Sequence, residues 1–322
     1  MIKKTLVVSA LGALMSANVA MAGPFVIDTG FDFDGAGGTT TTAVNELGYT
    51  DTRATSIYLG DPSVAGTPVV DTNIESVMNS YGFAEGTFTA IDGTSSVDMH
   101  YPFDPAQKNI DALNFATAAA DGNGFVSGVG GFPNDYGFAG VEGSTWGLTY
   151  DYMIAGATTA TGVSYNSGYF DVYFEDGTDR TQVVRLNVTG SDLAAANLDL
   201  FGNVTYDFDG DGIDDAAGDS FLENFFVDVE SGETFYSLWK AGYDVGNLMN
   251  VSWILDTNVN PPLPTEDELV AFATDDGTSL IRQVNLDGSV VFKVPEPWTL
   301  GLFGAGLLAL GFVARRRSRS VN

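Results

Sequence analysis

Residues 146–154 read WGLTYDYMI, and this stretch decides the fold class. Its large apolar side chains fall on alternate positions, at Trp146, Leu148, Tyr150, Tyr152 and Ile154. A period of two places all of them on one face of a strand, whereas an amphipathic helix repeats every 3.6 residues or so. The stretch is therefore predicted to be a β-strand with one face in a hydrophobic core.

Further short runs rich in aromatic and β-branched residues follow it, separated by Gly, Asn and Asp. They lie at residues 169–175, 183–188, 204–206, 225–229, 234–239 and 249–255. The last two runs, Leu280–Leu286 and Val290–Val294, flank Asp287-Gly288, which predicts a hairpin with a tight turn. Short strands at regular spacing predict an all-β cargo domain, a sandwich or jelly-roll-like fold.

The remaining signals are weaker. Residues 192–197 and 266–272 are the best candidates for short helices. Residues 30–143 are rich in glycine and are expected to form long loops on the same sandwich, with strands near 56–59, 86–91 and 96–100. No internal repeat or strong boundary divides the chain, so residues 23–293 are predicted to form a single acidic domain.

The amino end has the pattern of a secretory signal peptide. Lys3 and Lys4 precede an apolar run, and Ala20-Met21-Ala22 is a small-x-small cleavage site before Gly23. We therefore expect residues 1–22 to form a signal helix, to engage the Sec translocon, and to be removed.

The carboxyl end has the pattern of a membrane anchor preceded by an exposed extended segment. Pro295 and Pro297 flank Glu296 and disfavour helix. Residues 298–314 are almost wholly apolar and would span about 25 Å as a helix, just short of a typical hydrocarbon core. The basic cluster that follows predicts a cytoplasmic C-terminus for the transmembrane helix. It consists of Arg315, Arg316, Arg317 and Arg319.

Residues 294–319 resemble the PEP-CTERM sorting signal of Gram-negative bacteria, because Pro-Glu-Pro, a short apolar helix and an arginine cluster occur in that order. The resemblance implies recognition by an exosortase. It also implies an inner-membrane-anchored precursor that is processed and then delivered to the cell surface or the extracellular matrix, often into exopolysaccharide. The alternative is an ordinary single-pass anchor that is never cut. Residues 256–261 and 282–297 also resemble flocculation-associated members of this family.

Charge restricts the class of partner. The chain has 13 Lys+Arg and 42 Asp+Glu, and removing Lys3, Lys4, the four tail arginines and Glu296 leaves 7 − 41 = −34 for the cargo. Such a surface repels nucleic acid, whose phosphates need basic contacts. It attracts divalent cations, although the acidity is equally consistent with a saline habitat.

The sharpest local motif is DFDGDGIDD, residues 207–215. Ca²⁺ takes six to eight oxygen ligands, and loops of this kind supply carboxylates at alternate positions with a glycine at the sharp turn. The predicted ligands are Asp207, Asp209, Asp211, the Ile213 carbonyl and Asp215. The motif resembles the loops of EF-hand and dockerin proteins, but position 12 is Gly218 rather than Glu. The alternative is an acidic β-turn without a cation.

Catalytic patterns are sparse. The chain has no cysteine and one histidine, His100, which excludes the common zinc sites and Cys-His catalysis. Strand aromatics could stack on sugar rings, with Trp146, Tyr150 and Tyr152, joined by Tyr169 and Tyr173, as candidates; the alternative is that they form the core.

The sequence thus predicts a non-enzymatic surface or matrix protein that supports biofilm or floc formation. The second hypothesis is a secreted carbohydrate-binding module or a glycosidase on a lectin-like sandwich, whose mark would be a pair of carboxylates in an aromatic cleft.

Overall fold

The computed structural model describes residues 23–33, 35, 37–101, 112–113, 146–176, 179–194, 197–244, 251–259, 261–274 and 277–294. Strands account for 53% of the described residues and helices for 10%. The all-β class expected from the alternating runs is confirmed.

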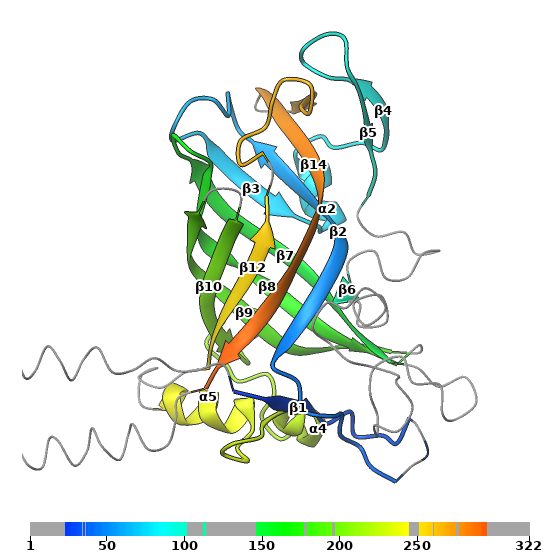
Figure 1. Ribbon diagram of the computed structural model, residues 1–322, viewed down its shortest axis with the longest axis vertical. Coiled ribbons are helices and arrows are strands. Elements are labelled where there is room, and N and C mark those ends of the chain that lie inside the picture. Colours follow the sequence, from blue (N-terminus) through cyan, green and yellow to red (C-terminus); the bar gives the residue numbers. More distant parts are fainter. Residues whose placement is uncertain are drawn as a thin grey trace, which may run out of the picture.

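In the described part of the chain, the main sheet is antiparallel and has ten strands, eight of which close into a ring because the first and the last of the eight pair (Figure 1). In sheet order they are β12 (Ser252–Asn258), β10 (Asn197–Thr205), β9 (Arg180–Ala194), β8 (Val163–Glu175), β7 (Gly147–Thr158), β3 (Pro68–Thr72), β2 (Glu46–Tyr58) and β14 (Gly277–Lys293). β14 then pairs with β12, from Lys293 opposite Ser252 to Gly288 opposite Thr257. The two layers expected of a sandwich are therefore opposite walls of one closed sheet. A short strand, β6 (Ala112–Leu113), also pairs with β7.

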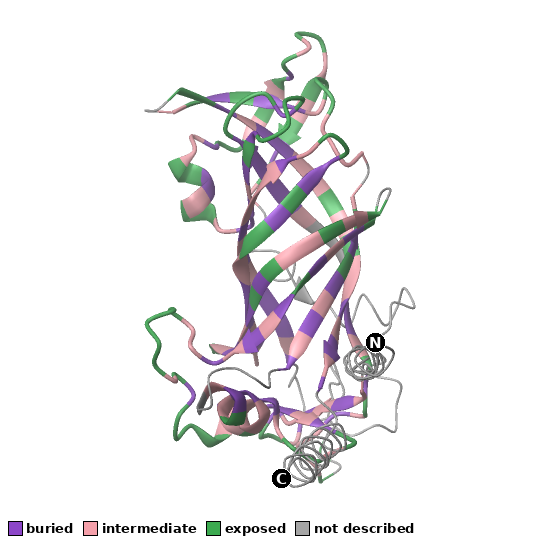
Figure 2. Ribbon diagram, turned by 90° about the vertical axis from the view of Figure 1, so that its left-hand side faces the viewer, coloured by how far each residue is buried: buried purple, intermediate pink, exposed green. Residues whose placement is uncertain are grey.

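The interior of the closed sheet is the main core. Along β7 the inward residues Leu148, Tyr150, Tyr152 and Ile154 are all buried, as the alternation predicts. Figure 2 shows the same alternation of buried and exposed residues along the walls.

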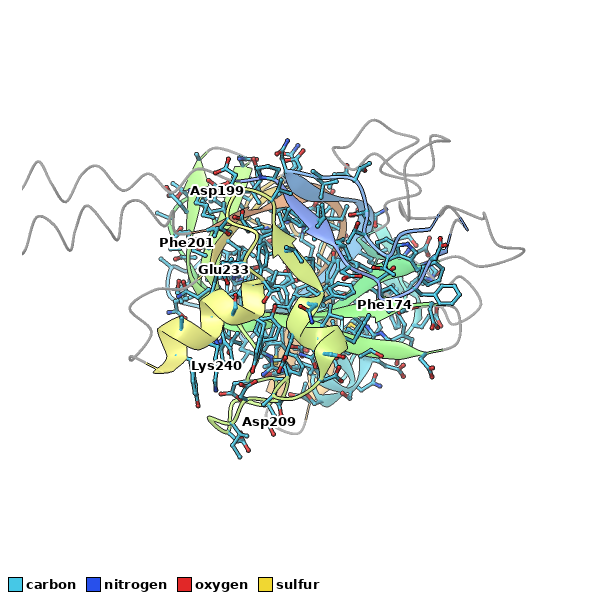
Figure 3. The ribbon with its side chains drawn as sticks, turned by 90° about the horizontal axis from the view of Figure 1, so that it is seen from below. Phe174, Asp199, Phe201, Asp209, Glu233 and Lys240 are labelled. Atoms are coloured by element: carbon cyan, nitrogen blue, oxygen red, sulfur yellow. The ribbon has the colours of Figure 1, made fainter. Side chains whose placement is uncertain are left out.

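Short elements cover the lower end of the closed sheet (Figure 3). They are β1 (Phe25–Ile27), its antiparallel partner β11 (Phe226–Asp228), α4 (Ser220–Asn224) and α5 (Phe235–Asp244). The rings of Phe25, Phe226, Phe235 and Phe292 pack edge-on, tilted or stacked, with centroids 5.2–5.9 Å apart. This aromatic cluster joins the lower elements to the last strand of the sheet.

A second, smaller core lies outside the sheet at its upper end. β13 (Val270–Thr274) pairs there with the first residues of β14 as a further strand of the sheet, and β4 (Gly86–Thr89), β5 (Ser96–Met99) and α2 (Glu75–Ser80) pack beside β13, β2 and β14. The buried members of this core are Ile57, Met78, Phe83, Met99, Val270, Phe272 and Ile281.

The hairpin predicted at residues 280–294 is wrong. β14 runs unbroken from Gly277 to Lys293, and Asp287-Gly288 forms a bulge where the register with β2 shifts. The two halves do not fold on each other because each has another partner: the first pairs with β13 and the second with β12.

Three other local predictions are also wrong. The strand predicted at 234–239 is the start of α5, and the helix predicted at 192–197 is the meeting of β9 and β10, where Ala194 pairs with Asn197. The helix predicted at 266–272 is a turn followed by β13. In each case, pairing or packing with distant residues overrides local propensity.

Both described ends of the chain lie at the lower end of the molecule (Figure 1). Pro24 accepts a hydrogen bond from Val229 next to β11, and β14 ends at Lys293 opposite Ser252. The signal segment 1–22 and the tail 295–322 lie outside the described residues. Among the residues that are described, no helix is long and apolar enough to cross a membrane.

Candidate functional site

The acidic motif forms a compact loop between β10 and α4. Gly210 and Gly212 adopt φ values of 82° and 84°, a left-handed conformation that other residues rarely take. The Asp207 carboxylate accepts backbone N–H bonds from both glycines, at 2.8 and 3.0 Å. These bonds curl the loop around the carboxylate, so the sequence D-x-D-G-D-G itself sets the shape.

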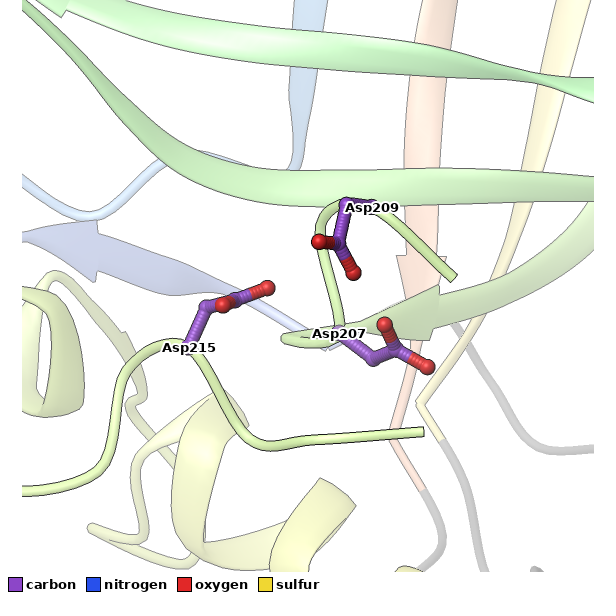
Figure 4. A group of neighbouring side chains, drawn as sticks. All are labelled: Asp207, Asp209 and Asp215. Atoms are coloured by element: carbon purple, nitrogen blue, oxygen red, sulfur yellow. The ribbon is translucent and has the colours of Figure 1, made fainter. Parts of the chain in front are cut away.

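Three carboxylates converge in this loop (Figure 4). Asp207, Asp209 and Asp215 each offer an oxygen, and these oxygens lie within 4.8 Å of one another. Two oxygens bound to one Ca²⁺ at 2.3–2.6 Å can be at most about 5 Å apart, so the spacing fits a shared cation. The donor set, hard carboxylate oxygens, is the one that calcium prefers.

The other two predicted ligands are placed differently. Asp211 is not part of the converging group, and its carboxylate accepts the Ile213 N–H at 2.8 Å. The Ile213 side chain is exposed.

Asp214, which the sequence reasoning did not select, anchors the loop to α5. Its carboxylate accepts a hydrogen bond from the Tyr236 hydroxyl at 2.8 Å and pairs with Lys240 at 3.1 Å. Tyr243, one turn further along α5, donates its hydroxyl to the Gly212 carbonyl. The acidic loop is therefore held on a helix that packs against the core.

A second set of carboxylates crosses the outer face of the sheet. Asp192, Asp199 and Asp256 lie directly beside one another on β9, β10 and β12. Like charges at such positions repel. Burial, followed by the charges of Asp256 and Asp192, raises the pKa of Asp199 above its ordinary value. We refer to these three residues as the acidic strip.

The proposed sugar-stacking residues do not form an exposed platform. Trp146, Tyr150 and Tyr152 are only 3–5% exposed, since they occupy the inward positions of β7. Tyr169 and Tyr173 instead lie on the outer face of β8, half-buried under Arg185 and Arg180, whose guanidinium carbons are 4.1 and 3.7 Å from the ring centroids.

The single histidine lies on the surface. His100 Nδ1 is 3.3 Å from a carboxylate oxygen of Glu85, and both side chains are about half exposed. This contact joins the end of β5 to the segment before β4.

The predicted processing residues lie outside the described part of the chain. They are Ala20 and Ala22 at the amino end, and Pro295, Glu296, Pro297, Arg315, Arg316 and Arg317 at the other. Gly23 and Val294, the described residues next to them, both lie at the lower end of the closed sheet, and Val294 is buried. The last strand thus leads straight into the tail.

Comparison with known proteins bears on this tail. Residues 293–317 match the family model of the PEP-CTERM protein-sorting motif. No match to the chain was found among curated proteins or solved structures. The motif is the recognition signal of exosortase. The chain therefore carries a PEP-CTERM protein-sorting motif at its C-terminus and is an exported protein, made as a membrane-anchored precursor and processed at that end.

Proposed function

We propose that the mature protein is a non-enzymatic component of the bacterial surface or matrix, where it holds cells and exopolysaccharide together with the help of calcium. The observation that carries the proposal is the direct junction between the sorting motif and the last strand of an acidic domain. An exosortase that cuts there would deliver the folded domain whole to the cell surface of a Gram-negative bacterium, where biofilm or floc forms.

The charge of the domain supports a role for a divalent cation. With a formal charge of −34 (7 − 41), it repels an acidic polysaccharide unless cations bridge them. Among the described residues, carboxylates crowd on the surface at the Asp207–Asp215 loop and at the acidic strip. The loop would hold calcium structurally, and the strip would present carboxylates to a cation shared with the matrix.

The test uses purified domain and native exopolysaccharide from the same cells. We expect the polysaccharide to be pulled down in calcium but not in chelator, and cells lacking the protein to disperse while growing normally. Wild-type flocculation in the deletion strain would contradict the proposal.

A matched pair of variants separates specific carboxylates from total charge. The first changes Asp192, Asp199 and Asp256 to Asn. The control changes the exposed Glu230, Glu266 and Asp267 to Gln, Gln and Asn. Both remove three negative charges, but only the first should weaken capture in calcium. Equal loss in the two variants would mean that charge alone drives association and that the strip has no part in it.

The same material tests the alternative, a carbohydrate-binding module or glycosidase. Hydrolysis of the polysaccharide, abolished by changing two carboxylates, would replace cohesion by catalysis as the function.

A further inference from the structure

The closed sheet encloses a cavity of about 60 Å³ towards its upper end. Its walls come from strands all around the sheet, including β3, β7, β8, β10 and β14. A water molecule needs about 10–15 Å³ of such space, so the cavity holds roughly four to six waters or one small organic molecule.

One wall of the cavity is polar. Asp71, which is 6% exposed, accepts hydrogen bonds from the hydroxyls of Ser56 and Tyr152, both at 2.5 Å, and of Tyr165 at 3.3 Å. Each hydroxyl has a single proton, and here it is donated to Asp71. The hydroxyl oxygens therefore keep lone pairs that can only accept.

Arg282 completes this wall with an unused donor. Its side chain is 2% exposed; Nη1 donates to the Pro261 carbonyl at 2.9 Å, and Nη2 pairs with Glu268 at 3.0 Å. Its Nε–H has no partner among the described residues. A buried charged group with an unmade hydrogen bond is costly, so a ligand or water that accepts from Nε is favoured.

The facing wall is apolar. Leu198 and Leu200 of β10 and Leu255 of β12 line the cavity, and in the closed order β10 stands opposite β3. Phe170 adds apolar surface between the two walls, since its ring stacks on that of Tyr152 with centroids 5.0 Å apart and meets that of Trp253 on β12 edge-on at 5.9 Å. A ligand here meets hydrocarbon on one side and a donor with several acceptors on the other.

We propose that this cavity binds a small uncharged ring compound that bears a hydroxyl group, of about the size of phenol. The hydroxyl accepts from Arg282 Nε–H and donates to a tyrosine oxygen, while the ring packs on the leucines. A charged ligand is disfavoured because its charge would be buried without a counter-ion: Arg282 repels a cation, and it is already paired with Glu268, which leaves no free positive charge for an anion. This site does not depend on the cohesive role proposed above.

The experiment is calorimetric titration of the full-length chain at neutral pH with phenol, benzene and benzylammonium, which keeps its positive charge there. We expect saturable binding of phenol, with affinity about tenfold above that of benzene because of the added hydrogen bonds, and no binding of benzylammonium. Absence of phenol binding would mean that the cavity holds only water. Equal affinity for benzene and phenol would show that the polar wall does not recognise the hydroxyl group, and tighter binding of benzylammonium than phenol would assign the site to cations instead.

Two lysine variants locate the interaction. Arg282→Lys keeps the charge but removes Nε, and should reduce phenol affinity to the level of benzene. Arg185→Lys, on the outer face and paired with Asp171, should change nothing. Should Arg282→Lys fail to fold, Leu200→Phe fills the cavity from the apolar side and should abolish binding of both compounds. Retained binding in a folded Leu200→Phe variant would place the ligand elsewhere and overturn the proposal.

Discussion

At the scale of single residues, the sequence identified the acidic loop but not which of its carboxylates converge. The alternating aspartates and the two glycines were enough to place the turn. Which of the aspartates point towards one another depends on the backbone N–H groups that each carboxylate binds. The Asp211 carboxylate accepts a hydrogen bond from the Ile213 N–H. The Asp214 carboxylate accepts one from Tyr236 on α5, a helix where a strand was predicted.

We therefore predict that Asp209→Ala and Asp211→Asn behave differently in calcium. A cation at 100 times its dissociation constant stabilises the folded state by about 2.7 kcal/mol, which raises Tm by roughly 5–10 °C in a domain of this size. Asp209→Ala should lose this rise, whereas Asp211→Asn should keep it. The measurement is thermal unfolding with excess calcium and with chelator. If the Tm of the wild type is the same in calcium and in chelator, the loop is an acidic turn that binds no calcium.

Asp71 and Arg282 were not selected from the sequence at all. The available signal was a charged residue at an inward position of an otherwise apolar run, Val69-Val70-Asp71 and Leu280-Ile281-Arg282. It could not be used, because the inward face of β14 becomes known only once its pairing is known.

Asp71 predicts a pH dependence of stability. Desolvation by burial raises the pKa of its carboxyl above the ordinary value, despite the hydrogen bonds from Ser56 and Tyr152. The folded state then binds the proton more tightly than the unfolded state, so this contribution to stability is complete below pH about 4 and is lost as pH rises through the folded pKa. The loss is at most about 1.4 kcal/mol per pH unit.

Asp71→Asn removes this titration. The unfolding free energy of the variant minus that of the wild type should therefore increase from pH 4 upwards, until the folded pKa is passed. Urea denaturation of both proteins at several pH values, at one calcium concentration, measures it. A difference that stays constant or decreases with pH would show that burial does not raise the pKa of Asp71.

At the scale of elements, strand existence was largely predictable and strand partnership was not. Alternation identified β7, β8 and the neighbouring strands because one of their faces is buried. The Asp287-Gly288 signal was misread since a bulge and a turn use the same residues. For α5, the Thr234 hydroxyl that caps the helix by accepting from Ser237 N–H was the local signal that the aromatic run obscured.

Close strand approach at Gly202 gives a prediction for the sheet. A Cβ there would lie 1.7 Å from the Asn187 carbonyl oxygen, beside the bulge where β9 and β10 change register. Gly202→Ala should destabilise the domain by about 3 kcal/mol or more, since backbone must move to admit it. Ser164→Ala, at an exposed position on β8, is the control and should change stability by less than about 0.5 kcal/mol. Equal unfolding midpoints in urea would show that β9 and β10 separate without cost.

At the scale of the whole molecule, both described ends of the chain lie at the same pole, which also carries α4 and α5 (Figure 1). Because the sorting motif begins at Lys293, the anchor of the precursor follows from this pole, and we expect β1, α4, α5 and the acidic loop to lie nearer the membrane than the upper end. This arrangement could not be predicted from the sequence, because it depends on the closure of the sheet by β12 and β14.

The tail gives a prediction at this scale. Changing Arg315, Arg316 and Arg317 to Ala removes three of the four positive charges that set the orientation of the anchor, so uncut precursor should accumulate. The matching change to Lys retains the charge and should be processed. Mass spectrometry of surface material reads the outcome through loss of the residues beyond Pro-Glu-Pro. Full cleavage of the alanine variant would show that charge does not govern processing.

The pairing of β14 with both β2 and β12 also fixes when the domain can fold during export. Val291 pairs with Glu46 and Phe292 with Trp253, so the edges of β2 and β12 stay unpaired until the last strand has crossed the membrane. Contacts so distant in sequence form slowly, so we expect the exported chain to stay open until then. The next residues to emerge are those of the sorting motif. Completion of the fold and arrival of the cleavage signal thus coincide, and the processing enzyme meets a substrate whose domain is only then able to close.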